Sequence, residues 1–163
     1  MRYLNKIVFI NSAAIRYSEV QLDGNIHLIG TQGVGKSTIL RAILFFYNAD
    51  TQRLGIPVEK KSYQDYYFPY ADSSIIYEVA REDGWFTVLS YKTMNRICYR
   101  FIASPYRPDL FIDEEGAPYP SDRIRSVLDK NGIKYSGAIS TYEEYRNILY
   151  GNSDNKRDYS CYS

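Results

Sequence analysis

Glycine, lysine and hydroxyl side chains lie between residues 30 and 38 at a spacing suited to holding phosphate groups. The segment is GTQGVGKST, with four residues between Gly30 and Gly35 and then Lys36 and Ser37. Glycines allow the backbone to curl until several N–H groups point at one phosphate. A lysine then reaches the outer phosphates, and a hydroxyl binds Mg²⁺. This chemistry predicts a cradle for a nucleoside triphosphate.

The elements on both sides of this segment are those that a phosphate-binding loop needs. The apolar run NIHLIG (25–30) predicts a strand that enters the loop, and KSTILRAILFFYN (36–48) has apolar residues at helical spacing. The helix N-terminus adds a dipole that favours anions. The full P-loop pattern therefore predicts nucleotide binding, with Ser37 on Mg²⁺. The expected nucleotide contacts are Gly30, Thr31, Gln32, Gly33, Val34, Gly35, Lys36, Ser37 and Thr38.

Hydrolysis needs two further groups: an acidic residue that ends a buried strand and binds Mg²⁺, and a group that orients the attacking water. Two strings match GTPase motifs, since DEEG (113–116) fits D-x-x-G and NKRD (155–158) fits N-K-x-D. In GTPases the second motif caps a buried parallel strand, whereas here the polar stretch YGNSD precedes it. We interpret this match as a coincidence of short strings.

A second way to complete the site uses LFIDEE (110–115), with Asp113 on the metal and Glu114 as the base. Its apolar run is three residues long, and buried parallel strands usually carry longer ones. A surface strand that enters a turn is the better interpretation of this segment. A self-contained small P-loop NTPase that uses Asp113 and Glu114 stays open as the alternative function.

Turn residues and alternating apolar residues predict a sheet around the loop. Asp23-Gly24 indicates a hairpin turn, and the strands after residue 74 predict an antiparallel meander. Strands are expected at 3–10, 19–23, 25–30, 75–80, 85–92 and 95–103, with a shorter one at 110–113. Besides the loop helix, helices are expected at 119–132 and 140–152, whereas 49–74 is expected to be mostly irregular.

This order of elements resembles the first lobe of the ATPase head of SMC-type ABC proteins. That group includes chromosome condensins, double-strand-break repair ATPases and bacterial anti-plasmid condensins of the Wadjet kind. In such heads, an antiparallel meander and helices that lead into a coiled coil follow the loop helix. The resemblance is strongest over residues 3–48 and rests on KIVFI, Asn11, EVQLDGNIHLIG, GTQGVGKST and ILRAILFFYN.

The resemblance implies an α/β P-loop NTPase fold, namely an ABC-type half head with a mixed or antiparallel sheet around the Walker A helix. Residues 1–152 would form this lobe, and 153–163 a polar tail that is disordered or truncated. The ligands would be ATP and Mg²⁺. Relatives often carry a basic residue soon after the position of Asn11, whereas this chain has Ser12-Ala13-Ala14, with Arg16 nearby.

The function implied is that of the ATP-binding N-terminal segment of an SMC-like ATPase that acts on DNA in chromosome maintenance, repair or anti-plasmid defence. The C-terminal half of the head would supply the Walker B acidic motif, the signature motif and the catalytic glutamate. A second protomer would complete an ATP-dependent dimer. We expect the chain to be an ATPase when so completed, and to bind ATP without hydrolysing it when alone.

Composition argues against several other classes. A net charge of +1 provides no global attraction to nucleic acid or to a membrane. One histidine, His27, and two distant cysteines, Cys98 and Cys161, exclude a zinc site made by this chain alone. The cysteines also indicate a reducing compartment. No apolar run is long enough to span a bilayer, so we expect a cytoplasmic protein with no membrane partner.

Tyrosine is common, at 18 residues, and several tyrosines lie beside lysines in EKKSYQDYYFPY (59–70). Basic and aromatic residues together bind nucleic acid through phosphate contacts and stacking. Tyrosines in a long loop also often pack that loop against the core, and this is the interpretation we favour.

Overall fold

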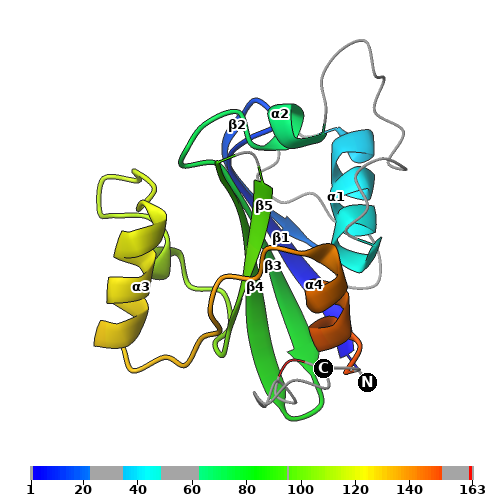
Figure 1. Cartoon of the computed structure of the whole chain (residues 1–163). Coiled ribbons are helices and arrows are strands. Elements are labelled where there is room, and N and C mark those ends of the chain that lie inside the picture. Colours follow the sequence, from blue (N-terminus) through cyan, green and yellow to red (C-terminus); the bar gives the residue numbers. More distant parts are fainter. Residues whose placement is uncertain (1, 23–34, 49–62, 95, 152–161, 163) are drawn as a thin grey trace.

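A five-stranded antiparallel sheet with helices on both faces forms the mixed α/β fold (Figure 1). The computed structural model describes residues 2–22, 35–48, 63–94, 96–151 and 162. The strands are β1 (Arg2–Ser12), β2 (Ile15–Gln21), β3 (Ser74–Arg81), β4 (Gly84–Thr93) and β5 (Arg96–Ile102), in the order β2-β1-β3-β4-β5. The helices are α1 (Lys36–Asn48), α2 (Tyr63–Tyr67), α3 (Ser121–Lys130) and α4 (Tyr142–Leu149), with a 3₁₀ helix, η2 (Pro108–Leu110).

Each face of the sheet buries its own hydrophobic cluster. Successive side chains of a strand point to opposite faces. In β3, Ile75 and Tyr77 join the cluster that contains α1 and α4, whereas Ile76 joins the cluster that contains α3. Figure 1 shows α1 and α4 on one side of the sheet and α3 on the other. A sheet covered on both faces explains why β3 is buried along almost its whole length.

Most of the expected elements within the described residues are confirmed. The strands β3, β4 and β5 pair antiparallel as the expected meander. The loop helix and the two later helices form, and the Thr141 side chain caps α4 by accepting a hydrogen bond from the Glu144 N–H. In this part of the chain, no helix is both long and apolar enough to cross a membrane.

Three expectations need correction. β2 begins at Ile15, four residues earlier than expected, because it pairs with β1 up to the turn. Within 49–74, residues 63–67 form α2, so this part is not irregular. The expected strand at 110–113 is wrong, since η2 ends there and Ile112 makes an isolated bridge to Pro118. The expected strand 25–30 and the Asp23-Gly24 turn lie outside the described residues.

The turn between β1 and β2 holds two alanines in the left-handed region. Ser12 pairs with Ile15, and Ala13 (φ 50°) and Ala14 (φ 62°) connect them. Two-residue hairpin turns of this kind favour Asn and Gly, because a Cβ atom costs about 1–2 kcal/mol there. The Ala13 side chain is buried in the core, whereas Ala14 is exposed.

We therefore expect Ala14→Gly to stabilise the protein. Relief of the left-handed strain, less the larger unfolded-state entropy of glycine, gives a gain of about 0.5–1 kcal/mol in the free energy of unfolding. Ala13→Gly is the matched control: it relieves the same strain but loses a buried methyl group, worth about 0.8 kcal/mol, and should be nearly neutral. Urea denaturation measures both. A loss of stability in Ala14→Gly would contradict the left-handed turn.

Candidate nucleotide-binding site

The end of the glycine-rich segment coincides with the start of α1. Gly35 directly precedes the helix, and its carbonyl accepts the first intrahelical hydrogen bond, from the Ile39 N–H at 3.2 Å. The side chains of Lys36 and Ser37 are exposed, whereas Thr38 is buried. Residues 30–34 lie outside the described part of the chain. The lysine and the hydroxyl expected to contact nucleotide and Mg²⁺ are thus accessible at a helix N-terminus.

One face of α1 fixes the helix on the sheet. Ile39, Ala42 and Phe45 are completely buried at spacings of three residues, and Phe46 is nearly so. The Phe45 ring stacks on Tyr63 of α2, with 4.5 Å between ring centroids. The loop end is therefore carried by a helix that cannot shift without disrupting the core.

Tyrosine hydroxyls bind the backbone of the same helix. The hydrogen bonds run from Tyr67 to the Thr38 carbonyl (2.8 Å), from Tyr77 to the Ala42 carbonyl (2.9 Å), from Tyr145 to the Phe46 carbonyl, and from Tyr150 to the Tyr47 carbonyl (2.9 Å). The last two satisfy carbonyls that the end of a helix leaves open. Burial raises the pKa of Tyr67 and of Tyr77, so both phenols remain protonated donors. This role of the tyrosines was not foreseen from the sequence.

The helix α2 contacts Thr38, one residue beyond Ser37, and is itself bonded to the β1–β2 turn. The Tyr66 hydroxyl lies 3.2 Å from the Thr38 Oγ1 atom, and the Tyr66 carbonyl accepts the Ala13 N–H at 3.2 Å. The β1–β2 turn and α2 are therefore both linked to the first turn of α1. Arg16, the basic residue nearest to this turn in sequence, is exposed.

Asp113 lies in a tight turn. Its Oδ1 atom accepts the N–H groups of Glu115 and Ala117, each at 2.9 Å. Gly116, with φ 82°, provides the left-handed position that closes the turn. The Glu114 side chain is exposed. Neither carboxylate follows a buried strand, and the Asp113 carboxylate already serves as a turn acceptor.

The sheet separates Asp113 from the start of α1. Leu110 and Phe111, just before Asp113, are buried in the α3-side cluster, whereas Ile39 of α1 is buried in the cluster on the opposite face. The structure therefore does not bring Asp113 and Glu114 together with Ser37. No group of three or more histidine, cysteine, aspartate or glutamate side chains that could hold a metal ion occurs within the described ranges.

Within the described residues 63–70, most tyrosines pack the chain against the core, which agrees with the packing interpretation. Tyr63 and Tyr67 are buried and stack at 4.3 Å, whereas Tyr70 is exposed. Lys60 and Lys61 lie outside the described residues, as do the NKRD string, His27 and Cys161.

Two arginines between residues 96 and 107, Arg100 and Arg107, have partners that explain them structurally. Arg100 is buried, donates to the Ser136 carbonyl at 2.7 Å and lies over the Tyr135 ring. Arg107 is hydrogen-bonded to Asp109, and this bond lowers the pKa of the Asp109 carboxyl. These contacts leave little reason to assign Arg100 or Arg107 to a ligand.

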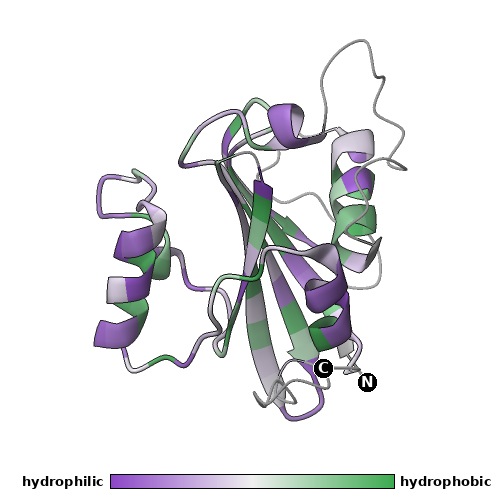
Figure 2. Cartoon of the chain, in the orientation of Figure 1, coloured by the Kyte–Doolittle hydropathy of each residue, from purple (hydrophilic) through white to green (hydrophobic). Residues whose placement is uncertain are grey.

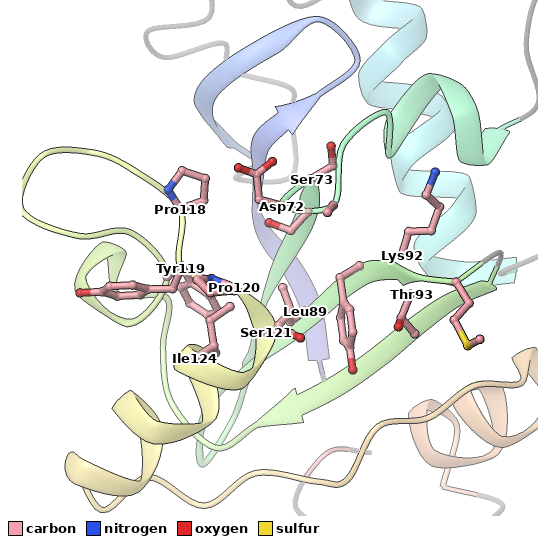
Figure 3. A pocket seen from close by; sticks show the side chains of 15 residues that line it. Asp72, Ser73, Leu89, Lys92, Thr93, Pro118, Tyr119, Pro120, Ser121 and Ile124 are labelled. Carbon is pink, nitrogen blue, oxygen red and sulfur yellow. The ribbon is translucent and has the colours of Figure 1, made fainter.

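A separate pocket of about 570 Å³ opens on the α3 side of the sheet. Figure 3 shows Asp72 and Ser73 at one edge of it, and Tyr119 and Ile124 at another. Leu89 contributes an apolar side chain to the lining. None of the described residues at the start of α1 lines this pocket, so it is distinct from the candidate nucleotide site.

Comparisons with known proteins place the chain in one family. Neither the curated proteins nor the solved structures gave a match. The profile of the family DUF3584, described as a protein of unknown function, matches residues 11–158. This span contains the whole GTQGVGKST segment, β2 to β5, α1 to α4 and η2. The chain belongs to the DUF3584 family.

Proposed function

We propose that the chain is the ATP-binding N-terminal segment of an SMC-like ATPase head that acts on DNA. The observation that carries the proposal is the coincidence of the P-loop pattern with the start of α1 at Lys36. A glycine-rich turn without function would not need an exposed lysine and an exposed serine as the first two residues of a rigidly packed helix.

The residues at the start of α1 suit a nucleotide with Mg²⁺. Lys36 would bind the β- and γ-phosphates, and Ser37 would hold Mg²⁺. The backbone N–H groups of the preceding glycine-rich segment and the helix dipole would compensate the remaining phosphate charge. The bound metal would neutralise charge that develops on the phosphates. The preference for ATP over GTP rests on the SMC-like resemblance.

The outer face of α1 carries exposed apolar side chains, which favours the proposal of a second lobe. Leu40, Leu44 and Tyr47 lie at i, i+4 and i+7, and remain 49%, 45% and 38% exposed. A surface helix normally turns polar residues outward, and Figure 2 shows α1 as more hydrophobic than α3. An apolar stripe that begins one turn from Lys36 suits a covering domain. We propose that the C-terminal half of the head covers it and brings the Walker B and catalytic carboxylates.

The antiparallel sheet agrees with the proposed ABC-type lobe. The β1–β2 hairpin and the β3-β4-β5 meander form one sheet, against which α1 packs. The action on DNA, the second protomer and a role in chromosome maintenance, repair or anti-plasmid defence follow from the resemblance alone, whereas the cytoplasmic location is expected from the sequence composition. They are part of the same proposal.

The self-contained NTPase is the weaker alternative. It needs Asp113 on the same metal as Ser37, yet Asp113 accepts hydrogen bonds from its own turn on the far side of the sheet. Hydrolysis by this chain alone would require the segment around Asp113 to move from the α3 side of the sheet to the start of α1.

The test measures Mg-ATP binding and phosphate release by the full chain, beside Asp113→Asn. We expect binding without turnover, and the same affinity in Asp113→Asn, because Asp113 serves a turn remote from α1. Isothermal calorimetry and a phosphate-release assay provide the two readouts. Turnover that Asp113→Asn abolishes would overturn the proposal in favour of the alternative, and absence of any nucleotide binding would overturn both.

A further inference from the structure

We propose that Tyr66 is a positioning residue for the nucleotide site, which orients the Thr38 hydroxyl toward a phosphate oxygen. This inference rests on the proposed function and deepens it. It assigns a role to α2, a short helix far from the glycine-rich segment in sequence. Thr38 would be the phosphate-contacting group, and Tyr66 would act through it.

Two consecutive tyrosines of α2 hold the same residue of α1 in different ways. The Tyr67 hydroxyl donates to the Thr38 carbonyl at 2.8 Å, whereas the Tyr66 hydroxyl bonds the Thr38 side chain at 3.2 Å. The Tyr67 bond fixes the backbone of the first turn. The Tyr66 bond adds nothing to the backbone and acts on a hydroxyl one residue beyond Ser37.

The Thr38 hydroxyl carries a single proton, so the direction of its hydrogen bond with Tyr66 decides whether Thr38 can donate to a ligand. A threonine hydroxyl has one proton to donate and can accept two hydrogen bonds. If Tyr66 donates, the Thr38 proton is free to point at a phosphate oxygen. Hydrogen bonds from neutral donors to a charged acceptor are stronger than those between neutral groups. A bound phosphate therefore favours the arrangement in which Tyr66 donates and Thr38 donates onward.

The position of Tyr66 is itself determined by the surrounding fold. Its carbonyl accepts the Ala13 N–H from the β1–β2 turn, and its ring packs edge-on against Tyr67, at 4.8 Å between centroids and 85° between ring planes. Tyr66 thus offers its hydroxyl from a fixed place.

A double-mutant cycle with Mg-ATP tests this role. The full chain would be compared as wild type, Tyr66→Phe, Thr38→Val and the double variant, with dissociation constants from calorimetry. We expect Tyr66→Phe to weaken binding about five-fold, the usual size for one neutral hydrogen bond. In the Thr38→Val background the same change should have no further effect, because the hydroxyl that Tyr66 orients is gone.

A contrast variant separates positioning from stability. Tyr67→Phe removes the hydrogen bond from the Tyr67 hydroxyl to the Thr38 carbonyl and should lower the melting temperature. Its effect on ATP binding should be independent of the Thr38 side chain. Tyr66→Phe should leave the melting temperature nearly unchanged while altering the dissociation constant. If Tyr66 had only a structural role, Tyr66→Phe would lower the melting temperature. Its effect on ATP affinity would then add to that of Thr38→Val in the double variant.

The outcomes distinguish the two proposals. Wild-type binding that Lys36→Ala abolishes but Tyr66→Phe leaves unchanged would overturn the role of Tyr66 and keep the proposed function. Equal losses from Tyr66→Phe in the presence and in the absence of the Thr38 hydroxyl would also overturn it. A wild-type chain that binds no Mg-ATP would overturn both.

Discussion

Replacing Glu78 by alanine is expected to lower the free energy of unfolding by about 4 kcal/mol, since the change strips two buried hydrogen-bond donors of their acceptor at once. Glu78 is 6% exposed and lies in β3, the central strand of the sheet. Its Oε1 atom accepts from the Asn5 amide at 2.8 Å, and its Oε2 atom accepts from the Tyr106 N–H at 2.7 Å.

The carboxylate stabilises an irregularity of the neighbouring strand. The pairing of β1 with β3 shifts register between Leu4 and Lys6, so Asn5 is the extra residue of a bulge. Its backbone carbonyl accepts the Leu22 N–H at 2.8 Å, and Gln21 donates to its side chain at 3.0 Å. Without Glu78, the Asn5 amide and the Tyr106 N–H would be buried without partners, each costing about 1–3 kcal/mol.

Glu78→Gln is the matched control for this prediction. Glutamine has the same shape and can still accept one hydrogen bond, so we expect a loss of about 1–2 kcal/mol. Thermal and urea unfolding measure both variants, and the alanine variant should melt about 10 °C lower. A loss below about 1 kcal/mol in Glu78→Ala would contradict the prediction, because water would then be replacing the carboxylate.

The parts of the fold that follow local rules could be predicted. Alternating apolar residues with Glu82-Asp83-Gly84 between them define β3 and β4, because period-two patterning and turn residues act within a few positions. The α1 helix follows from its apolar spacing, and glycines with positive φ, Gly132 and Gly151, lie just past the ends of α3 and α4, where a glycine commonly ends a helix.

The parts that depend on distant partners could not be predicted. The bulge at Asn5 requires Glu78, 73 residues away, and the bonds of Tyr145 and Tyr150 to α1 span 99 and 103 residues. The high tyrosine count was a visible signal, but the local sequence around a tyrosine does not determine which carbonyl group its hydroxyl will bond. The LFID segment failed as a strand because a proline-started 3₁₀ helix precedes it and a turn follows at once.

The candidate site also has a part that could be predicted from the sequence and a part that could not. Lys36 and Ser37 come from one short motif, so their placement at a helix N-terminus was predictable. Tyr66 joins the site through α2, across a connection of which residues 49–62 are not described. The distance between Asp113 and α1 depends on which face of the sheet each segment covers, and face assignment follows only from the completed sheet.

Lys36→Ala is expected to weaken Mg-ATP binding by at least about 100-fold, equivalent to about 2.7 kcal/mol. The lysine would contribute a full positive charge to the β- and γ-phosphates from an exposed position on the first residue of α1. Since the change removes an exposed side chain, the stability of the ligand-free protein should change by less than about 0.5 kcal/mol. Calorimetry measures the affinity and thermal unfolding the stability.

Thermal unfolding with added ligand provides the sharpest form of this comparison. At about 100 times the dissociation constant, Mg-ATP should stabilise the wild-type chain by about 2.7 kcal/mol, and Lys36→Ala should lose most of this gain. Lys134→Ala removes an exposed lysine from the loop after α3, so the ligand should stabilise it like wild type. Chelation of Mg²⁺ should reduce the gain in wild type because Ser37 then has no metal to bind. If Lys36→Ala kept the full gain, ATP would be bound elsewhere and the start of α1 would not be the nucleotide site.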